Sequence, residues 1–126
     1  MAHDIIHTDK APAAIGPYSQ ATKGCANLFT SGQLGIDPAT GELPADFTAQ
    51  ARQAFENLKS IIEAAGGSMS NIMKVTIFLT DMANFPAVNA VMQEYCQAPY
   101  PARSCFAVAA LPKGGAVEVE AIVSLW

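Results

Sequence analysis

The chain has 126 residues, of which 51% are hydrophobic and only 14% charged, and its formal net charge is −4 at pH 7. This length suits one domain, so we expect a single domain over residues 1–126 that buries a core without disulfide or metal staples. The seven Lys and Arg residues are scattered singly, which argues against a nucleic-acid-binding surface. No apolar run approaches the length of a membrane span.

The three cysteines, Cys25, Cys96 and Cys105, form no C-x-x-C pair, so neither a disulfide framework nor a zinc site is indicated. The first residues lack the charged and then apolar layout of a secretory signal. We therefore expect a reducing, cytoplasmic compartment. The charged fraction lies well below the norm of about 25%, which favours an oligomer that covers apolar surface over a monomer with a rich core.

The first half of the chain predicts a strand, a turn and a long helix. Residues 27–35 (NLFTSGQLG) form the strand candidate, and Asp37-Pro38 and Thr40-Gly41 supply turn chemistry after it. From residue 46 the apolar residues follow helical spacing for about five turns, and Gly66-Gly67 ends the helix. The predicted buried stripe is Phe47, Ala51, Ala54, Phe55, Leu58, Ile61, Ile62 and Ala65.

The middle of the chain predicts a strand and a second helix. Residues 71–79 alternate, which places Met73, Val75, Ile77 and Leu79 on one face and Lys74 and Thr76 on the other. The second helix is expected to begin with Asn84 as its cap and Pro86 in its first turn. Its buried stripe is Val88, Val91, Met92 and Tyr95, with Asn89 at the edge of the stripe.

Two further strands are predicted over residues 103–110 and 117–125, joined by LPKGG, whose glycines permit a tight reversal. The resulting order of strands and helices in one short chain predicts an α+β fold, in which two helices pack on one face of a mixed sheet.

The last strand, AVEVEAIVSLW, carries one apolar face over Val117, Val119, Ala121, Val123 and Leu125. The opposite face mixes Glu118 and Glu120 with Ile122 and Trp126, which suggests that another subunit covers it. A carboxylate there is desolvated and holds its proton more strongly, which suits Glu120 for general acid–base chemistry. The alternative is that Glu120 pairs with an arginine only to hold an interface.

An arginine opens the strand in PYPARSCFAVAAL, and side chains two positions apart on a strand share a face, so Arg103 and Cys105 should lie together. A guanidinium there can bind a carboxylate, although a lone arginine more often covers apolar neighbours with its stem. Cys105 is expected to line a cavity rather than act as a nucleophile, because the only histidines, His3 and His7, lie near the amino terminus. The same two histidines make a poor metal site.

Four segments, APAAIGPYSQA, FTSGQLGIDPATGEL, YPARSC and VEVEAIV, resemble the motifs of the reactive intermediate deaminase family, of the RidA or YjgF type, in order and spacing. The resemblance implies a chorismate-mutase-like α+β fold, a homotrimer and active sites in the clefts between subunits. It also implies hydrolysis of 2-imino acids and their enamine tautomers, such as 2-aminoacrylate and 2-iminobutanoate, to 2-oxo acids and ammonia. These substrates are released by pyridoxal-phosphate enzymes such as serine and threonine dehydratases, and the family itself needs no cofactor.

The resemblance assigns the substrate carboxylate to Arg103 and, with the acid–base reasoning above, the activation of water to Glu120. It places four further residues in the substrate pocket: Tyr18, Ser31, Asn89 and Cys105. Two other functions stay open. A non-catalytic module could bind a 2-oxo acid through Arg103 alone. Some members of the superfamily are described as ribonucleases or translation inhibitors, which the acidic net charge disfavours.

Overall fold

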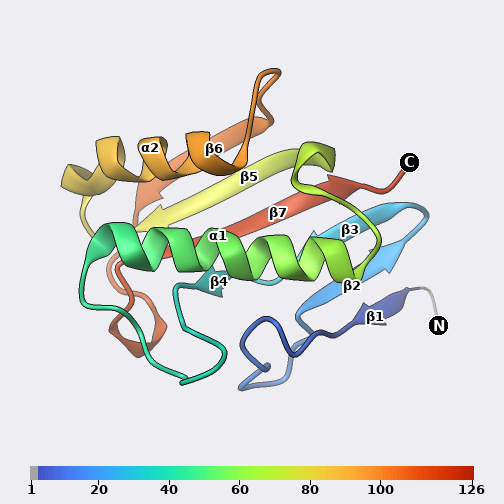
Figure 1. Cartoon of the computed structure of the whole chain (residues 1–126), viewed down its shortest axis with the longest axis horizontal. Helices are drawn as coiled ribbons and strands as arrows, with labels where there is room; N and C mark the ends of the chain where they lie inside the picture. The colour runs from blue at the N-terminus through green and yellow to red at the C-terminus, as the bar shows by residue number, and fades with distance from the viewer. Residues whose placement is uncertain (1–2) are drawn as a thin grey trace.

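Residues 3–126 of this computed structural model form a mixed β-sheet with two helices on one face (Figure 1). The first two residues of the domain predicted over 1–126 lie outside this described part. The expected α+β fold is confirmed, and both helices are where the periodicity places them. In Figure 1 the helix α1 runs in front of the sheet, and the opposite face of the sheet looks away from the viewer.

The sheet has the strand order β1-β2-β3-β7-β5-β6, and the short strand β4 also pairs with β7. Strands β5 and β6 are parallel, whereas all the other pairs are antiparallel. The strands are β1 Asp4–Ile6, β2 Ala21–Gly24, β3 Asn27–Thr30, β4 Gln33–Leu34, β5 Ile72–Leu79, β6 Ala102–Ala107 and β7 Val117–Ser124. The helices are α1 Phe47–Ala64 and α2 Phe85–Tyr95, and single 3₁₀ turns are η1 Met69–Asn71, η2 Met82–Asn84 and η3 Pro112–Gly114.

Helix α1 begins and ends as its sequence directs. The Asp46 carboxylate accepts a hydrogen bond from the backbone N–H of Ala49 at 3.0 Å, which satisfies one of the free donors of the first turn. After the last turn Gly66 has φ of +90°, a left-handed conformation that glycine adopts at no steric cost. The apolar stripe between these ends packs onto the sheet.

Helix α2 departs from its prediction at the cap. Asn84 occupies the residue before the helix, but its side chain makes no capping hydrogen bond. The chain already turns there, because η2 precedes the helix directly and is itself capped by Asp81, which accepts from the N–H of Ala83 at 2.9 Å. Asn84 thus belongs to the 3₁₀ turn η2, which continues directly into α2. The backbone N–H of Phe85, at the start of α2, donates to the carbonyl of Met82 in that turn.

The predicted face of β5 is wrong at Met73. A β-bulge shifts the register of β5 against β7 between Ile72 and Lys74, so Ile72 is buried and Met73 is 47% exposed. From Val75 onward the predicted alternation holds, with Val75, Ile77 and Leu79 fully buried. An added residue at a bulge changes the face of every residue before it, which alternation alone does not reveal.

Several strand boundaries and one connection also differ from the predictions. The strand expected over residues 27–35 is broken at Ser31 and Gly32 into β3 and β4. The strand expected over 103–110 ends at Ala107, and LPKGG does not close a hairpin, because β6 and β7 pair with opposite sides of β5. The short strands β1 and β2 carry too few residues to show a period, and the sequence did not predict them.

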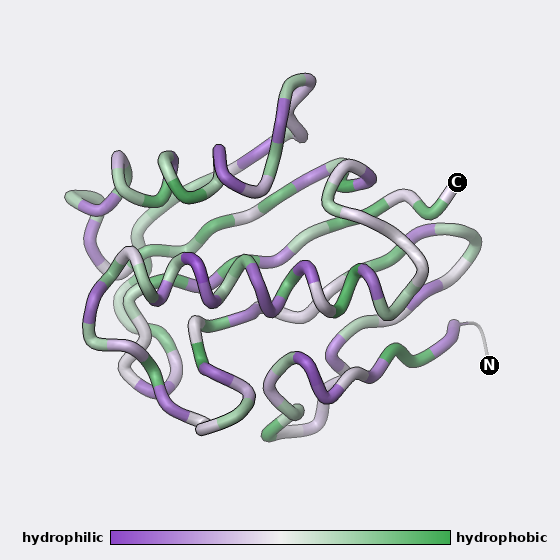
Figure 2. Tube along the Cα trace, viewed as in Figure 1, coloured by the Kyte–Doolittle hydropathy of each residue, from purple (hydrophilic) through white to green (hydrophobic). Residues whose placement is uncertain are grey.

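The central strand β7 divides the molecule into a buried and an open side. Its inner side chains, Val117, Val119, Ala121 and Val123, lie under the helices with at most 3% exposure. The hydropathy of the trace follows this arrangement in Figure 2, where the strands behind α1 are largely hydrophobic. The outer side chains of β7 are only partly buried, because no element of the described chain covers that face.

Buried amides on α1 hold the segment that becomes the wall of the site. Asn57 is fully buried, and its Nδ2 donates to the carbonyls of Leu34 at 3.0 Å and Ile36 at 2.8 Å. Gln50 donates to the carbonyl of Pro44 and accepts from the N–H of Ala116, which joins the same helix to the start of β7. These backbone groups lie away from water, so their partners on α1 are required.

We expect Asn57→Ala to lower the free energy of unfolding by about 2–4 kcal/mol, because two buried carbonyls lose their donor. The measurement is denaturant unfolding at one fixed protein concentration, since association also affects apparent stability. Ser60→Ala on the same helix is the matched control, as Ser60 makes no side-chain hydrogen bond among the described residues, and should change stability little. Equal stability of Asn57→Ala and Ser60→Ala would contradict this role of Asn57.

Candidate functional site

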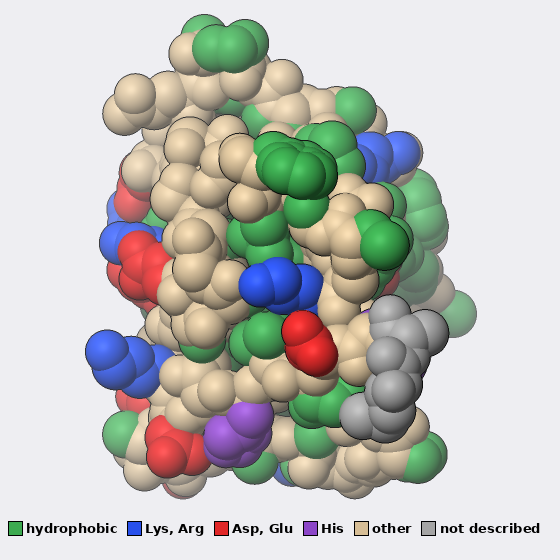
Figure 3. Space-filling model, turned by 90° about the vertical axis from the view of Figure 1, so that its right-hand side faces the viewer, with side chains coloured by type: hydrophobic (Ala, Val, Ile, Leu, Met, Phe, Trp, Pro, Cys, Tyr) green, Lys and Arg blue, Asp and Glu red, His purple; other side chains and the backbone are tan. Residues whose placement is uncertain are grey.

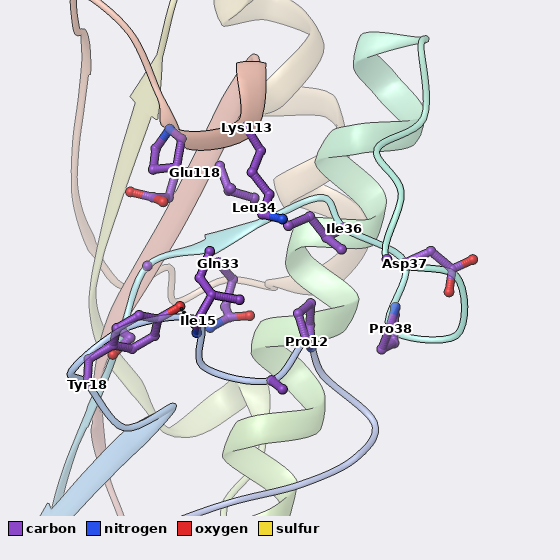
Figure 4. A pocket seen from close by; sticks show the side chains of 15 residues that line it. Pro12, Ile15, Tyr18, Gln33, Leu34, Ile36, Asp37, Pro38, Lys113 and Glu118 are labelled. Carbon is purple, nitrogen blue, oxygen red and sulfur yellow. Dashed lines mark hydrogen bonds between the residues drawn. The ribbon is translucent and has the colours of Figure 1, made fainter.

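A pocket of about 480 Å³ opens where β4, the outer face of β7 and the loop before β2 meet (Figure 4). Its walls are mostly apolar, with polar groups from Tyr18, Ser31 and Glu118 on one side. In Figure 4 Lys113 reaches from η3 toward Leu34, whereas the Asp37 carboxylate points outward. The lining residues include Pro12, Ile15, Tyr18, Ser31, Gln33, Leu34, Ile36, Asp37, Pro38, Lys113 and Glu118.

Tyr18 and Ser31, both predicted in the substrate pocket, lie together in it. The Tyr18 hydroxyl accepts from the N–H of Ile15 at 3.2 Å, so its own proton is available to a ligand. The Ser31 hydroxyl instead donates to the carbonyl of Ser19 at 2.5 Å, which leaves its oxygen only as an acceptor. The fully bonded, buried Gln20 holds the loop at residues 8–12 beside them.

Glu118 lies on the polar side of this pocket, on the outer face of β7. Burial, and secondarily the negative charge of Glu120, raises the pKa of the Glu118 carboxyl above its usual range. It stands opposite Phe78 in the register of β7 with β5, and Phe78 packs edge to face with Phe106 at 5.3 Å. A Cβ on Gly32 would come within 2.7 Å of the Glu118 carboxyl carbon, so only glycine lets the carboxylate lie where it does.

Glu120, the residue favoured by the sequence for acid–base chemistry, lies two positions further along β7 on the same outer face, opposite Thr76. It is not among the residues that line the pocket. The sequence reasoning therefore missed Glu118, although VEVEA presents both carboxylates on one face. The pairing of β4 with β7 distinguishes the two glutamates, because it sets Glu118 opposite Leu34 and against Gly32. The sequence alone does not reveal this pairing.

Arg103 and Asn89 form a second cluster at the outer strand β6 and helix α2. Nη1 of Arg103 donates to Oδ1 of Asn89 at 2.5 Å and lies 3.8 Å from the sulfur of Met92. Its guanidinium carbon lies 5.2 Å from the centre of the Phe85 ring. The side chain remains exposed to solvent although three contacts hold it. The guanidinium is therefore held in place by its neighbours and faces solvent.

The predicted common face of Arg103 and Cys105 is present, because they pair with the buried positions Val75 and Ile77 of β5. Cys105 is partly buried against the core. Burial raises the pKa of its thiol, and the nearby Arg103 charge offsets this only in part. A thiol with a raised pKa stays protonated at neutral pH, which disfavours attack by Cys105 as a nucleophile. Cys105 is not among the residues that line the pocket described above.

The two clusters lie on opposite faces of the sheet within one chain. Arg103 shares the helix-covered face with Val75, whereas Glu118 stands on the open face opposite Phe78, three positions further along β5. The structure thus brings Arg103, Asn89 and Cys105 together, and separately Tyr18, Ser31 and Glu118. Residues 3–126 contain no group of three His, Cys, Asp or Glu side chains that could hold a metal ion. No helix in this described range is long and apolar enough to cross a membrane.

Comparison with known proteins agrees with this arrangement. The family model described as Endoribonuclease L-PSP matches residues 8–125. The chain belongs to the RidA family. A 2-iminobutanoate/2-iminopropanoate deaminase of Capra hircus is 52% identical to it over 123 residues, covering 97% of this chain and 90% of the relative.

Solved structures match the RidA-family fold closely. RidA from an Antarctic Psychrobacter species superimposes with a TM-score of 0.94 at 53% identity, covering 96% of this chain and 98% of that one. Escherichia coli TdcF, solved with bound serine, gives a TM-score of 0.92 at 48% identity with the same coverage. At these identities the backbone described above is that of the family.

The raised pKa of Cys105 makes a chemical prediction for this RidA-family protein. Iodoacetamide should alkylate the exposed Cys25 much faster than Cys105 at pH 7, because the thiolate is the reacting form and burial also limits access. The rate at Cys105 should rise only at alkaline pH. Peptide mass spectrometry at timed intervals measures both sites in the same sample, with Cys25 as the internal reference. Preferential alkylation of Cys105 at neutral pH would indicate an activated thiolate.

Proposed function

We propose that this protein is a deaminase that hydrolyses 2-imino acids and their enamine tautomers to 2-oxo acids and ammonia. The observation that carries the proposal is that one chain contains both a pocket with a partly desolvated carboxyl, Glu118, and a separate, fixed and outward guanidinium, Arg103. The names of relatives about half identical to the chain support it. Serine bound to TdcF supports it further, since serine carries the carboxylate that a guanidinium recognises.

The proposal requires a second copy of the chain to join the two clusters, and we place the site between subunits of a homotrimer. The open sheet face is the surface that would be covered. It carries Ile5, Phe29 and Phe106, each about half exposed, and Ile122 beside them. In Figure 3 hydrophobic side chains stand along the right-hand edge, the side that looks away from the viewer in Figure 1. Apolar surface of this kind is normally buried in an assembly.

In the proposed reaction Arg103 of one subunit binds the substrate carboxylate, and the imine carbon lies in the pocket of the next subunit. Water adds to the C=N carbon, one of its protons passing to Glu118 and from there to the nitrogen, which gives a carbinolamine. The carbinolamine hydroxyl then gives up its proton, which reaches the nitrogen, and the C–N bond breaks as the C=O bond forms, so that ammonia leaves. Tyr18 is placed to donate a hydrogen bond to the substrate, and Ser31 to accept one. The C=N carbon is already electrophilic, so positioning and proton transfer supply the acceleration.

We assign the proton transfer to Glu118 in place of Glu120, because of the two only Glu118 lines the pocket, and burial raises the pKa of its carboxyl. A carboxyl whose pKa is raised accepts a proton from water more readily and can then return it to nitrogen. Glu120 acts on it through its charge, which favours the protonated form of Glu118. A module that only binds a 2-oxo acid would have no use for such a group, and this distinguishes the two functions.

The ribonuclease alternative has names in its favour: the description of the family model that matches the chain, and the names of two similar solved structures, which include the word endoribonuclease. The net charge of −4 and the mostly apolar pocket argue for a small substrate rather than a phosphate backbone. The three free cysteines agree with a cytoplasmic setting, in which pyridoxal-phosphate dehydratases would supply the imines.

Arg103→Ala should weaken binding of 2-oxobutanoate, the product of 2-iminobutanoate hydrolysis, by about 10- to 100-fold, because a charge-assisted hydrogen-bond partner is lost. Turnover should fall further, since the imine is no longer oriented. Arg103→Lys should restore little, as an ammonium cannot form the two-pronged pair. Calorimetric binding and a coupled assay with threonine dehydratase measure the two effects. Wild-type affinity in Arg103→Ala would contradict the proposed role.

Exchanging each glutamate for glutamine separates the two candidates. Glu118→Gln should lower kcat by about 10²–10⁴-fold, the usual worth of a proton-transfer group, and leave 2-oxobutanoate affinity nearly unchanged. Glu120→Gln is the matched control two residues away and should reduce kcat by less than about tenfold. The same coupled assay reports both. The opposite order of effects would return the catalytic role to Glu120.

A further inference from the structure

We propose that Phe85 is a positioning residue that fixes the Arg103 guanidinium so that its Nε–Nη2 edge meets the substrate carboxylate. The inference rests on the proposed function and adds to it a residue outside the predicted site. Phe85 is the first residue of α2, and its ring lies 5.2 Å from the guanidinium carbon of Arg103. A cation over an aromatic face is attracted by the electron density of the ring.

The contacts of Arg103 determine which of its donors are left for a ligand. Asn89 and Met92 both lie against Nη1, at 2.5 Å and 3.8 Å. The guanidinium has five N–H groups in one plane, so the Nε proton and the two Nη2 protons remain without a hydrogen-bond partner in residues 3–126. Two parallel N–H groups from Nε and Nη2 match the two oxygens of a carboxylate. The carboxylate therefore approaches the side of the guanidinium away from Asn89.

Asn89 alone would leave the guanidinium plane free to rotate about the Nη1 contact. The Phe85 face restricts this rotation, because a planar cation lying over a ring gains contact only in a narrow range of tilts. The ring itself is well anchored. It packs against the hydrophobic core, and the backbone N–H of Phe85 donates to the carbonyl of Met82 in η2. Asp81 caps that turn, so two consecutive turns hold the ring in place.

If Phe85 only positions Arg103, removing its ring should weaken substrate binding and leave the rate of the chemical step nearly unchanged. Removing the ring should raise KM for the imine and the dissociation constant of 2-oxobutanoate by about 3- to 30-fold, the range expected for an exposed to partly desolvated cation–π contact. Arg103 and its hydrogen bond to Asn89 remain in such a variant, so the bound imine is still oriented, and kcat should change by less than about threefold.

The test compares Phe85→Leu, Phe85→Tyr, Phe47→Leu and Arg103→Ala in the full-length protein. Phe85→Leu keeps apolar bulk and removes the ring, whereas Phe85→Tyr keeps the ring face and should bind 2-oxobutanoate like the wild type. Phe47 is the matched control, since it is the first residue of α1, packs against the same core and lies outside the site. Phe47→Leu measures the general cost of losing such a ring.

The probe is 2-oxobutanoate binding by calorimetry, together with KM and kcat from the coupled assay and the NMR signal of the Arg103 Nε–H. Phe85→Leu should move that signal away from its ring-shifted position, and Phe47→Leu should not. Weakened binding in Phe85→Leu alone supports the inference. If Arg103→Ala loses binding but Phe85→Leu and Phe47→Leu both bind like the wild type, Phe85 has no positioning role, and the proposed function stands. If Arg103→Ala also binds normally, the proposed function fails.

Discussion

Side chains of a β-strand alternate between two faces, and in this molecule that alternation separates the two halves of the chemistry. On β7 it directs Val117 and Val119 into the core and Glu118 to the open face. On β6 it turns Arg103 to the helix side, where Asn89 of α2 holds it. The backbone of one chain cannot bring these faces together. The same constraint that builds the core therefore keeps the guanidinium and the carboxyl apart in one chain, and the proposed function requires a second subunit to join them.

The open face would give the proposed association a physical cause. Its exposed aromatic and aliphatic side chains surround a carboxyl whose pKa burial already raises within one chain. Covering the face would bury apolar surface and desolvate Glu118 further, which moves its pKa toward the range that suits proton transfer. Covering the open face would then both stabilise the assembly and raise the pKa of Glu118 further. Asn57 and Gln50 support both, because they fix the backbone of the pocket wall from the far side of the sheet.

Much of the fold follows from the sequence because periods of 3.6 and 2 residues report which side of an element is buried. The stripe of α1 and the inner face of β7 were predicted in this way, and the chain presents both. The bulge before Lys74 and the break at Gly32 depend on how neighbouring strands pair, which a single strand does not encode. For the same reason the sequence could not separate the two glutamates of β7, and the prediction chose Glu120. Only the pairing of β4 with β7 places Glu118, and not Glu120, beside Tyr18 and Ser31.

The most direct test of a shared site mixes two inactive proteins. Arg103→Ala and Glu118→Gln subunits are unfolded together in equal amounts, refolded and assayed for hydrolysis of 2-iminobutanoate, with each variant refolded alone as control. If each site takes Arg103 from one subunit and Glu118 from another, random assembly gives about one quarter of the sites both intact residues, and activity returns to about that fraction. Activity no greater than that of the separate variants, from a mixture shown by sedimentation to contain mixed assemblies, would contradict the account.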